Sequence, residues 1–278
     1  MNKLKEGKLI NINKNLYTIM SDSNSVFECS VRGKLRNDEL IVGDNVLFDK
    51  NSKTIEKIHE RKNSLIRPLV SNIDKLLIIT STHIPKFSTY LIDKFIVIAL
   101  QNNIEPIIII TKEDLLKFKE KLIVRRYMKY YKKQGYKVYL NTQINKIKKE
   151  FKYSVVALCG QTGAGKSTLL NKIDPSLKLQ TDDISLSLGR GKHTTRMVTL
   201  YKVSNGLVAD TPGFSSVDLN VKKDELKNYF IEFGYNCKYK SCNHTNEDGC
   251  TVIEKVKHKK ILKSRNENYL KIYEELKK

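Results

Sequence analysis

One segment limits the possible folds of this chain more than any other, the G-x-x-x-x-G-K-S pattern that begins at Gly160. The mostly apolar run 153–159 before it predicts a buried strand, and residues 168–173 read as the start of a helix. In a strand–loop–helix unit, glycines permit a tight loop whose backbone N–H groups surround phosphate oxygens. The pattern therefore predicts phosphate binding by Gly160, Gln161, Thr162, Gly163, Ala164, Gly165, Lys166, Ser167 and Thr168.

Two further features predict chemistry at this loop. Lys166 is expected to reach the β- and γ-phosphates as a catalytic residue, and the Ser167 hydroxyl is expected to bind Mg²⁺. Downstream, an apolar strand ends in D-T-P-G, where Asp210 predicts a second Mg²⁺ contact. Gly213 has no side chain, so its backbone N–H is expected at the γ-phosphate.

A base-reading motif follows another apolar strand, at Thr111, Lys112, Glu113 and Asp114. In GTPases the motif N/T-K-x-D places a carboxylate against the guanine N1–H and the N2 amino group, while the lysine stem covers the base. Adenine lacks that pair of donors, so Asp114 favours GTP over ATP. Thr111 stands where Asn is commoner, which predicts looser contacts to the P-loop or the base.

The order of these motifs is unusual. Ordinary GTPases run P-loop, D-x-x-G, base reader, whereas here the base reader at 111–114 precedes the P-loop at 160–167. The order predicts a circular permutation, which is permitted where the original termini lie close together. The segment after D-x-x-G then leads directly into the C-terminal part of the chain.

The loop between the P-loop and D-x-x-G contains G-R-G-K-H-T-T-R at 189–196. Thr194 and Thr195 are expected to complete Mg²⁺ coordination when a γ-phosphate is present, which is the behaviour of a switch loop. Phe214 follows D-T-P-G where a water-orienting Gln is usual, and His193 is the nearest candidate to replace that Gln. A basic loop that contacts RNA is the alternative interpretation.

The C-terminal part holds four good metal ligands within 14 residues: Cys237, Cys242, His244 and Cys250. Three thiolates and one imidazole are typical of a closed tetrahedral site, so we expect one structural Zn²⁺. The isolated Cys29 and Cys159 are expected to be ordinary reduced thiols.

Charge indicates the class of partner. The chain has 51 Lys+Arg against 30 Asp+Glu, a formal net charge of +21 spread along its length. Such an excess favours nucleic acid, although a Lys-rich composition that only solvates the surface would look the same. The N-terminus has no signal-peptide core and the apolar runs are too short for a bilayer, so we expect a cytoplasmic protein with no membrane contact.

The succession of strand-like and helix-like segments predicts a multidomain α/β protein. Short β-like runs at 8–12, 16–20, 26–31 and 45–48 predict a small barrel at residues 1–67, with an OB-fold as the natural size match and an SH3-like barrel nearly as good. Alternating strands and helices predict a permuted P-loop GTPase domain at 68–218. Residues 219–278 are expected to form a zinc-binding segment and a basic terminal helix at about 253–278.

Barrel, permuted GTPase and Cys/His segment in this order resemble the circularly permuted small-ribosomal-subunit biogenesis GTPases, the RsgA family. The resemblance covers essentially the whole chain and rests on Val42-Gly43-Asp44, Arg67-Pro68, Asn72-Ile73-Asp74, residues 111–114, 160–168, 193–195 and 210–215, and the Cys/His spacing. It implies an OB-fold, late maturation of the 30S subunit through contact with 16S rRNA, low intrinsic GTP hydrolysis to GDP, and stimulation by the bound subunit. We expect a monomer.

Two positions depart from the family pattern. Arg196 stands where a third Thr is common, and Asn141-Thr142 stands where a Ser-Ala loop often contacts guanine. The Arg196 departure concerns coordination of Mg²⁺ by the switch loop, and the Asn141-Thr142 departure concerns the affinity for the base. The residues leave two other functions as alternatives: an RNA-binding scaffold with a vestigial pocket, against which the intact Lys166, Ser167 and Asp210 argue, and an ATPase or kinase acting on RNA, against which Asp114 argues.

Overall fold

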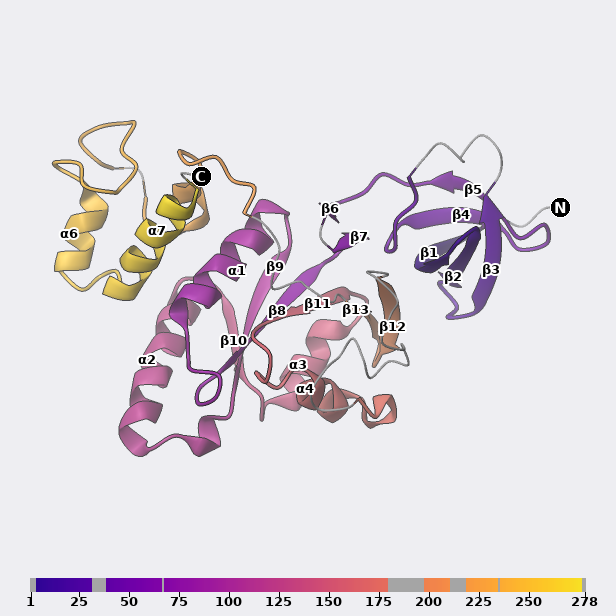
Figure 1. Cartoon of the computed structure of the whole chain (residues 1–278), viewed down its shortest axis with the longest axis horizontal. Coiled ribbons are helices and arrows are strands. Elements are labelled where there is room, and N and C mark those ends of the chain that lie inside the picture. The colour runs from indigo at the N-terminus through magenta and orange to yellow at the C-terminus, as the bar shows by residue number, and fades with distance from the viewer. Residues whose placement is uncertain are drawn as a thin grey trace.

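The structure is a computed structural model that describes residues 4–31, 39–66, 68–179, 198–210, 219–234 and 236–276. Three parts succeed one another along the chain: a barrel, a central α/β unit and a small helical C-terminal part (Figure 1). No helix within the described ranges is both long and apolar enough to cross a membrane.

The barrel closes in the strand order β1-β2-β3-β5-β4. Its interior is apolar because alternate residues of each strand face inward; Leu9, Ile19 and Phe48 are fully buried there. The pairing of β3 with β5 is parallel, while the other pairs are antiparallel. This Greek-key order matches the OB-fold and not the SH3-like alternative. The strands are β1 (Leu4–Asn13), β2 (Leu16–Ser21), β3 (Val26–Val31), β4 (Asn45–Asp49) and β5 (Thr54–Ile58).

A buried polar junction joins the barrel to the central unit. The carboxylate of Asp44 is fully buried and accepts hydrogen bonds from Arg61 Nε at 2.7 Å, Ser71 Oγ at 2.7 Å and the Ile41 backbone N–H. Gly43 has φ +99°, and a Cβ there would lie 2.1 Å from the Ser71 carbonyl oxygen. Only glycine fits this close approach, which accounts for the V-G-D turn. The short hairpin β6 (Ser64–Ile66) and β7 (Leu69–Ser71) carries the junction.

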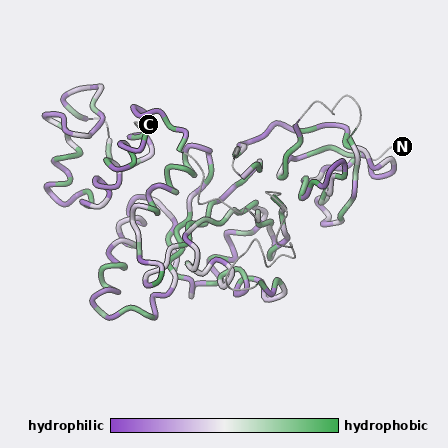
Figure 2. Tube along the Cα trace, in the orientation of Figure 1, coloured by the Kyte–Doolittle hydropathy of each residue, from purple (hydrophilic) through white to green (hydrophobic). Residues whose placement is uncertain are grey.

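The central unit is a six-stranded sheet in the order β10-β9-β8-β11-β13-β12. Every pair is parallel except β12 with β13, so the sheet is mainly parallel. The strands are almost continuously hydrophobic because both faces are covered (Figure 2). The strands are β8 (Lys75–Ser81), β9 (Glu105–Thr111), β10 (Lys137–Leu140), β11 (Val155–Cys159), β12 (Thr199–Val203) and β13 (Gly206–Asp210).

Helices cover the two faces in pairs. One core contains residues of α1 and α2 packed on Ile78 and Ile108, and the other contains residues of α3 and α4 packed on Ile79 and Ile109. Neighbouring strand residues therefore point to opposite layers, which is the period of a β-strand. The helices are α1 (Thr89–Gln101), α2 (Phe118–Lys133), α3 (Ile144–Phe151) and α4 (Lys166–Ile173), with one-turn 3-10 helices η2 (Glu113–Leu115) and η3 (Pro175–Leu177).

The C-terminal part corrects one prediction. The single basic helix expected at about 253–278 is two helices, α6 (Thr251–Lys257) and α7 (Lys263–Glu275). Lys259 adopts φ 58° at the turn between the two helices, and Ile261 is only 2% exposed. Burial of Ile261 therefore fixes the position of the turn, although the sequence has no Gly or Pro there. A 3-10 helix, η5 (Leu226–Tyr229), packs on α1 before the Cys/His segment.

Candidate nucleotide-binding and metal sites

The predicted nucleotide motifs meet at one edge of the central sheet. Strands β8, β9, β10, β11 and β13 run parallel, so the loops after them emerge on the same side. The base-reading motif follows β9, the Asn141-Thr142 turn follows β10, and the glycine loop follows β11. Ligands of open parallel sheets bind at this carboxyl edge. The base reader and the glycine loop therefore lie at one edge of the sheet despite their unusual order in the chain.

The glycines of the 160–167 loop are required by its backbone. Gly160 has φ 136°, and a Cβ there would lie 2.1 Å from the Ile79 carbonyl oxygen of the adjacent strand. Gly163 and Gly165 also have positive φ, at 76° and 95°. Side chains at these positions would either clash or hold the backbone in a strained conformation. The loop therefore turns tightly from β11 into α4, as the motif predicts.

Lys166 and Ser167 begin α4 at the mouth of this loop. The Lys166 ammonium donates to the Gly160 and Gln161 carbonyl oxygens, each at 2.9 Å. Ser167 is 4% exposed and lies in the first turn of α4, where backbone N–H groups have no partner within the helix. A phosphate at this position would meet the helix N-terminus, the glycine-loop N–H groups and the lysine together.

Thr111 and Lys112 join the base-reading motif to the glycine loop. The buried Thr111 hydroxyl contacts the Ala164 carbonyl oxygen at 2.7 Å and the Thr80 carbonyl oxygen at 3.3 Å. Lys112 has φ 61°, and its ammonium donates to the Gly163 carbonyl oxygen at 2.9 Å. Although Thr111 replaces the commoner Asn, it keeps a direct contact to the P-loop.

The remaining base-side residues surround the same opening. Asp114 is exposed within η2, so its carboxylate is available to a ligand. Glu113 instead accepts a hydrogen bond from Arg125 Nε at 2.9 Å, so its carboxylate joins the base-reading motif to α2. The backbone N–H of Asn141 donates to the Ile110 carbonyl oxygen at 2.9 Å, which holds the 141–142 turn beside the end of β9.

Asp210 is the last residue of β13, next to β11 in the sheet. Its backbone therefore ends at the same edge as the glycine loop. The other candidates for the γ-phosphate side, His193, Thr194, Thr195 and Gly213, lie outside the described residues, as do Arg196 and Phe214. Their roles stay predictions from the sequence.

The four predicted metal ligands converge. The Sγ atoms of Cys237, Cys242 and Cys250 lie 3.5, 3.5 and 3.4 Å from His244 Nδ1. All four ligand atoms lie within 4.8 Å of one another. Tetrahedral bonds to zinc of about 2.3 Å for sulfur and 2.0–2.1 Å for nitrogen place S and N about 3.5 Å apart. The cluster thus has the size of a tetrahedral Zn²⁺ site, and its donor set can hold a metal ion.

The surroundings fix the geometry of this cluster. The Cys237 sulfur lies 3.3 Å from the Thr251 hydroxyl, and His244 packs edge-on against Phe233 with ring centroids 5.6 Å apart. The Glu247 carboxylate accepts backbone N–H bonds from Asn243 and Thr245 at 2.8 Å each. Ligands held in place by outer contacts are typical of structural metal sites.

The other two cysteines behave as expected. Cys29 and Cys159 are buried free thiols, far apart in the fold. Burial raises the pKa of Cys29 to about 11 and raises that of Cys159 well above its ordinary value. Neither thiol is therefore a thiolate near neutral pH, and neither has the character of a reactive site.

One cluster was not anticipated from the sequence. Arg265 of α7 is 1% exposed and donates to Asp93 of α1 at 2.6 Å and to Glu232 at 2.6 and 3.0 Å. Asp93 also accepts from Tyr131 and Asn268. We call Asp93, Tyr131, Glu232, Arg265 and Asn268 the Arg265 cluster. The sequence offers one indication of this cluster: Asp93 lies in the otherwise largely apolar run 90–100. A carboxylate on a buried helix face needs a partner.

Comparison with known proteins agrees with this arrangement. The RsgA GTPase family matches residues 58–220, which is more than half of the chain. The small ribosomal subunit biogenesis GTPase RsgA of Halalkalibacterium halodurans is 41% identical, with 98% of this chain and 97% of that protein covered. This chain belongs to the RsgA GTPase family.

Two solved structures show the same fold. YjeQ from Thermotoga maritima superposes with a TM-score of 0.86 at 33% identity and covers 99% of both chains. YloQ, described as a circularly permuted GTPase, superposes with a TM-score of 0.84 at 33% identity, over 99% of this chain and 96% of that one. The permuted motif order predicted from the sequence is therefore a property of this RsgA-family fold.

Proposed function

We propose that this protein hydrolyses GTP to GDP and phosphate while bound to the small ribosomal subunit during late maturation of that subunit. One observation carries the GTPase part: the Thr111 hydroxyl contacts Ala164 of the P-loop, so the base reader and the phosphate loop form one site. The subunit as partner is supported by the names of its relatives and by the net charge of +21.

The proposed roles follow the geometry of the sheet edge. Asp114, with Thr111 and Lys112, binds the guanine base. The N–H groups of the 160–168 loop bind the phosphates, and Lys166 neutralises charge that develops on the β–γ bridge in the transition state. These groups position the γ-phosphate and stabilise its charge, which is most of what phosphoryl transfer needs from a protein.

Ser167, Asp210, Thr194 and Thr195 are proposed to hold Mg²⁺ with the nucleotide. The ion would neutralise phosphate charge when bound. His193 is proposed to orient the attacking water in place of the usual Gln. Gly213 is proposed to contact the γ-phosphate through its backbone N–H.

The rest of the chain is proposed to recognise RNA. We assign residues 1–67 to an OB-type RNA-binding domain, 68–218 to the GTPase domain and 219–278 to a domain stabilised by one Zn²⁺ on Cys237, Cys242, His244 and Cys250. Contacts to 16S rRNA would run mainly through phosphates. We propose that the protein acts as a monomer in the cytoplasm.

The test is GTP turnover by the purified protein, alone and with isolated 30S subunits. We expect slow turnover alone and strong stimulation by subunits, with ATP not hydrolysed and Lys166→Ala inactive in both conditions. A rate that subunits do not change would contradict the proposed partner. Equal use of ATP would contradict the role of Asp114.

A further inference from the structure

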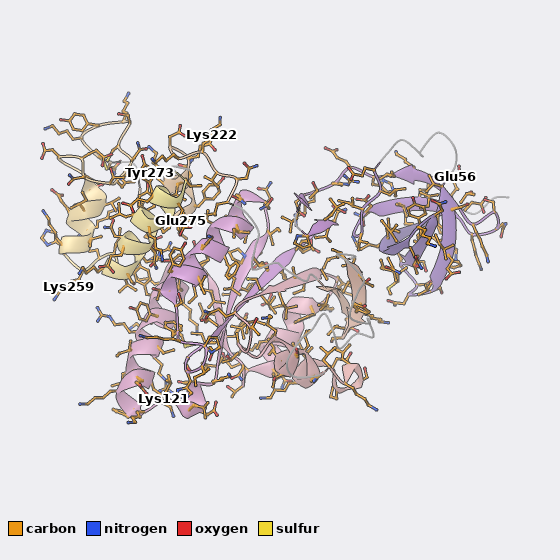
Figure 3. All side chains as sticks on the ribbon, viewed as in Figure 1. Glu56, Lys121, Lys222, Lys259, Tyr273 and Glu275 are labelled. Atoms are coloured by element: carbon orange, nitrogen blue, oxygen red, sulfur yellow. The ribbon has the colours of Figure 1, made fainter. Side chains whose placement is uncertain are left out.

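A cluster of positive charge outside the nucleotide edge lies between α2 and the turn that joins α6 to α7. A cleft of about 430 Å³ opens there. Its polar lining is entirely cationic, and no acidic residue lines it: the four charged side chains are Arg126, Lys257, Lys259 and Lys263. Figure 3 labels Lys259 at this turn and Lys121 toward the opposite end of α2.

The floor of the cleft is apolar. Val256, Ile261 and Leu262 line it between the cations, and Ile261 is 2% exposed. Lys263 has only an exposed partner on its own helix, Glu267 at 3.3 Å. Within the described parts of the chain, Arg126, Lys257 and Lys259 have no carboxylate at ion-pair distance. A ligand that offers several negative charges and a less polar body would satisfy both features.

The two walls of the cleft are fixed relative to each other. Arg126 belongs to α2, whereas the three lysines belong to the C-terminal part. One helical turn after Arg126, the Tyr130 hydroxyl donates to Glu232 at 2.9 Å, and Glu232 also accepts from the buried Arg265. Arg265 lies two residues after Lys263. The Arg265 cluster therefore fixes the spacing of the cations on the two walls.

Further cations extend the same surface along α2. Lys129 and Lys133 follow Arg126 at intervals of three and four residues, so they lie on one side of the helix, and both are exposed. A row of regularly spaced positive charges suits a polymer with regularly spaced negative charges. RNA carries one phosphate for every nucleotide, so it offers such a repeat along its whole length.

We infer that this cleft, together with the row along α2, is an RNA-binding site that the GTPase unit and the C-terminal part build jointly. Phosphates bind Arg126 and the three lysines, while a ribose or base covers Val256, Ile261 and Leu262. The inference rests on the proposed function only for the source of the RNA, which would be the small subunit. The cationic cleft itself does not depend on it.

The experiment uses the full-length double variant Arg126→Glu/Lys259→Glu and a matched control, Lys121→Glu/Lys146→Glu. Both change the net charge equally, and the control residues lie in α2 and α3 outside the cleft. The probe is a labelled oligouridylate of about 16 nucleotides, within the range of single-strand site sizes. Binding is measured over a series of KCl concentrations, and GTP turnover without subunits checks that each variant is folded.

We expect the cleft variant to bind the oligonucleotide at least about tenfold more weakly and to lower the salt slope by about 1.4, or about 0.7 for each phosphate that is no longer neutralised. The control should stay within about twofold and keep its slope. Neutral Arg126→Gln/Lys259→Gln should give the same slope change as the charge reversal.

Equal decreases in affinity for the cleft variant and the control would overturn the inference, because the effect would then be one of net charge. Unchanged oligonucleotide binding by the cleft variant would also overturn it. If that variant then failed to co-sediment with 30S subunits, the result would indicate an acidic protein segment as the ligand. The proposed function is tested separately: if subunits fail to stimulate wild-type GTP turnover while the cleft variant still loses oligonucleotide binding, that function fails and the RNA site stands.

Discussion

At the scale of single residues, the nucleotide edge depends on short polar contacts between loops that are distant in sequence. Thr111 and Ala164 are 53 positions apart, yet their contact is 2.7 Å. Lys112 adds a second link through the Gly163 carbonyl oxygen. These two contacts join the base reader directly to the phosphate loop, so each should matter for nucleotide affinity.

Thr111→Val tests this point because it keeps the shape and removes the hydroxyl. Loss of a hydrogen bond to a buried carbonyl oxygen costs about 1–3 kcal/mol. We expect the affinity for a fluorescent GDP analogue to fall about tenfold, since about 1.4 kcal/mol is one decade. Thr18→Val in the barrel should leave it unchanged. Wild-type affinity in Thr111→Val would show that the contact is incidental.

At the scale of elements, one carboxylate adds polar contacts to the apolar packing of α3 on the sheet. Glu150 accepts from Lys75 and Lys137 at 3.0 Å each and from the Tyr139 hydroxyl at 2.8 Å. Burial alone would raise the pKa of Glu150, but these hydrogen bonds outweigh it and hold the pKa below its ordinary value. The folded state therefore favours the carboxylate.

The sign of the pH dependence follows from linkage. A carboxyl group whose pKa is depressed by folding contributes stability above its unfolded pKa and loses it as the pH falls through the folded pKa. We expect Glu150→Gln to lower the free energy of unfolding at pH 7 by about 1–3 kcal/mol. In urea titrations, the difference in free energy of unfolding between the variant and wild type should shrink as the pH falls below 4.5, the ordinary pKa of a glutamate. A difference independent of pH would contradict this, and exposed Glu267→Gln is the control.

The contact between α7 and the GTPase unit depends on the Arg265 cluster. Replacing Arg265 by Met would leave the carboxylates of Asp93 and Glu232 buried without their cation, which typically costs about 3–5 kcal/mol. We expect hydrogen exchange to accelerate in α1 and α7 while the barrel is unaffected. The control is Lys263→Met, which lies on the same helix but has a side chain that is 84% exposed. This variant should leave hydrogen exchange in both α1 and α7 unchanged. Uniform acceleration across the chain would instead indicate global unfolding.

The same cluster shows where sequence reasoning stops. The glycines at 160–165 and the Cys/His ligands were predictable because their roles depend on local spacing and residue chemistry. The pairing of Asp93 with Arg265 joins positions 172 apart. Likewise, the sequence did not separate an OB-fold from an SH3-like barrel, because the distinction depends on the parallel β3–β5 pair. Both depend on tertiary packing that no local pattern records.

At the scale of the whole molecule, the metal cluster and the nucleotide edge are separate sites joined through α1. We expect one Zn²⁺ per chain by elemental analysis. Its removal by a chelator, or Cys250→Ser, should unfold residues 236–276 because structural zinc supplies folding free energy directly. GTP affinity should change by less than about twofold, as expected for distant sites. Loss of nucleotide binding together with the metal would show that the two parts fold as one unit.

In the proposed site, residues 111–114 read the base of the nucleotide whose phosphates bind residues 160–167. The most direct measurement is the affinity of Asp114→Asn for GTP and for xanthosine triphosphate. Xanthine carries a carbonyl where guanine carries an amino group, so an amide can donate where the carboxylate accepted. We predict that GTP binding weakens at least about 100-fold, since two charge-assisted hydrogen bonds are lost, and that xanthosine triphosphate becomes the preferred ligand. Unchanged GTP affinity and an unchanged preference for GTP would contradict base recognition by Asp114.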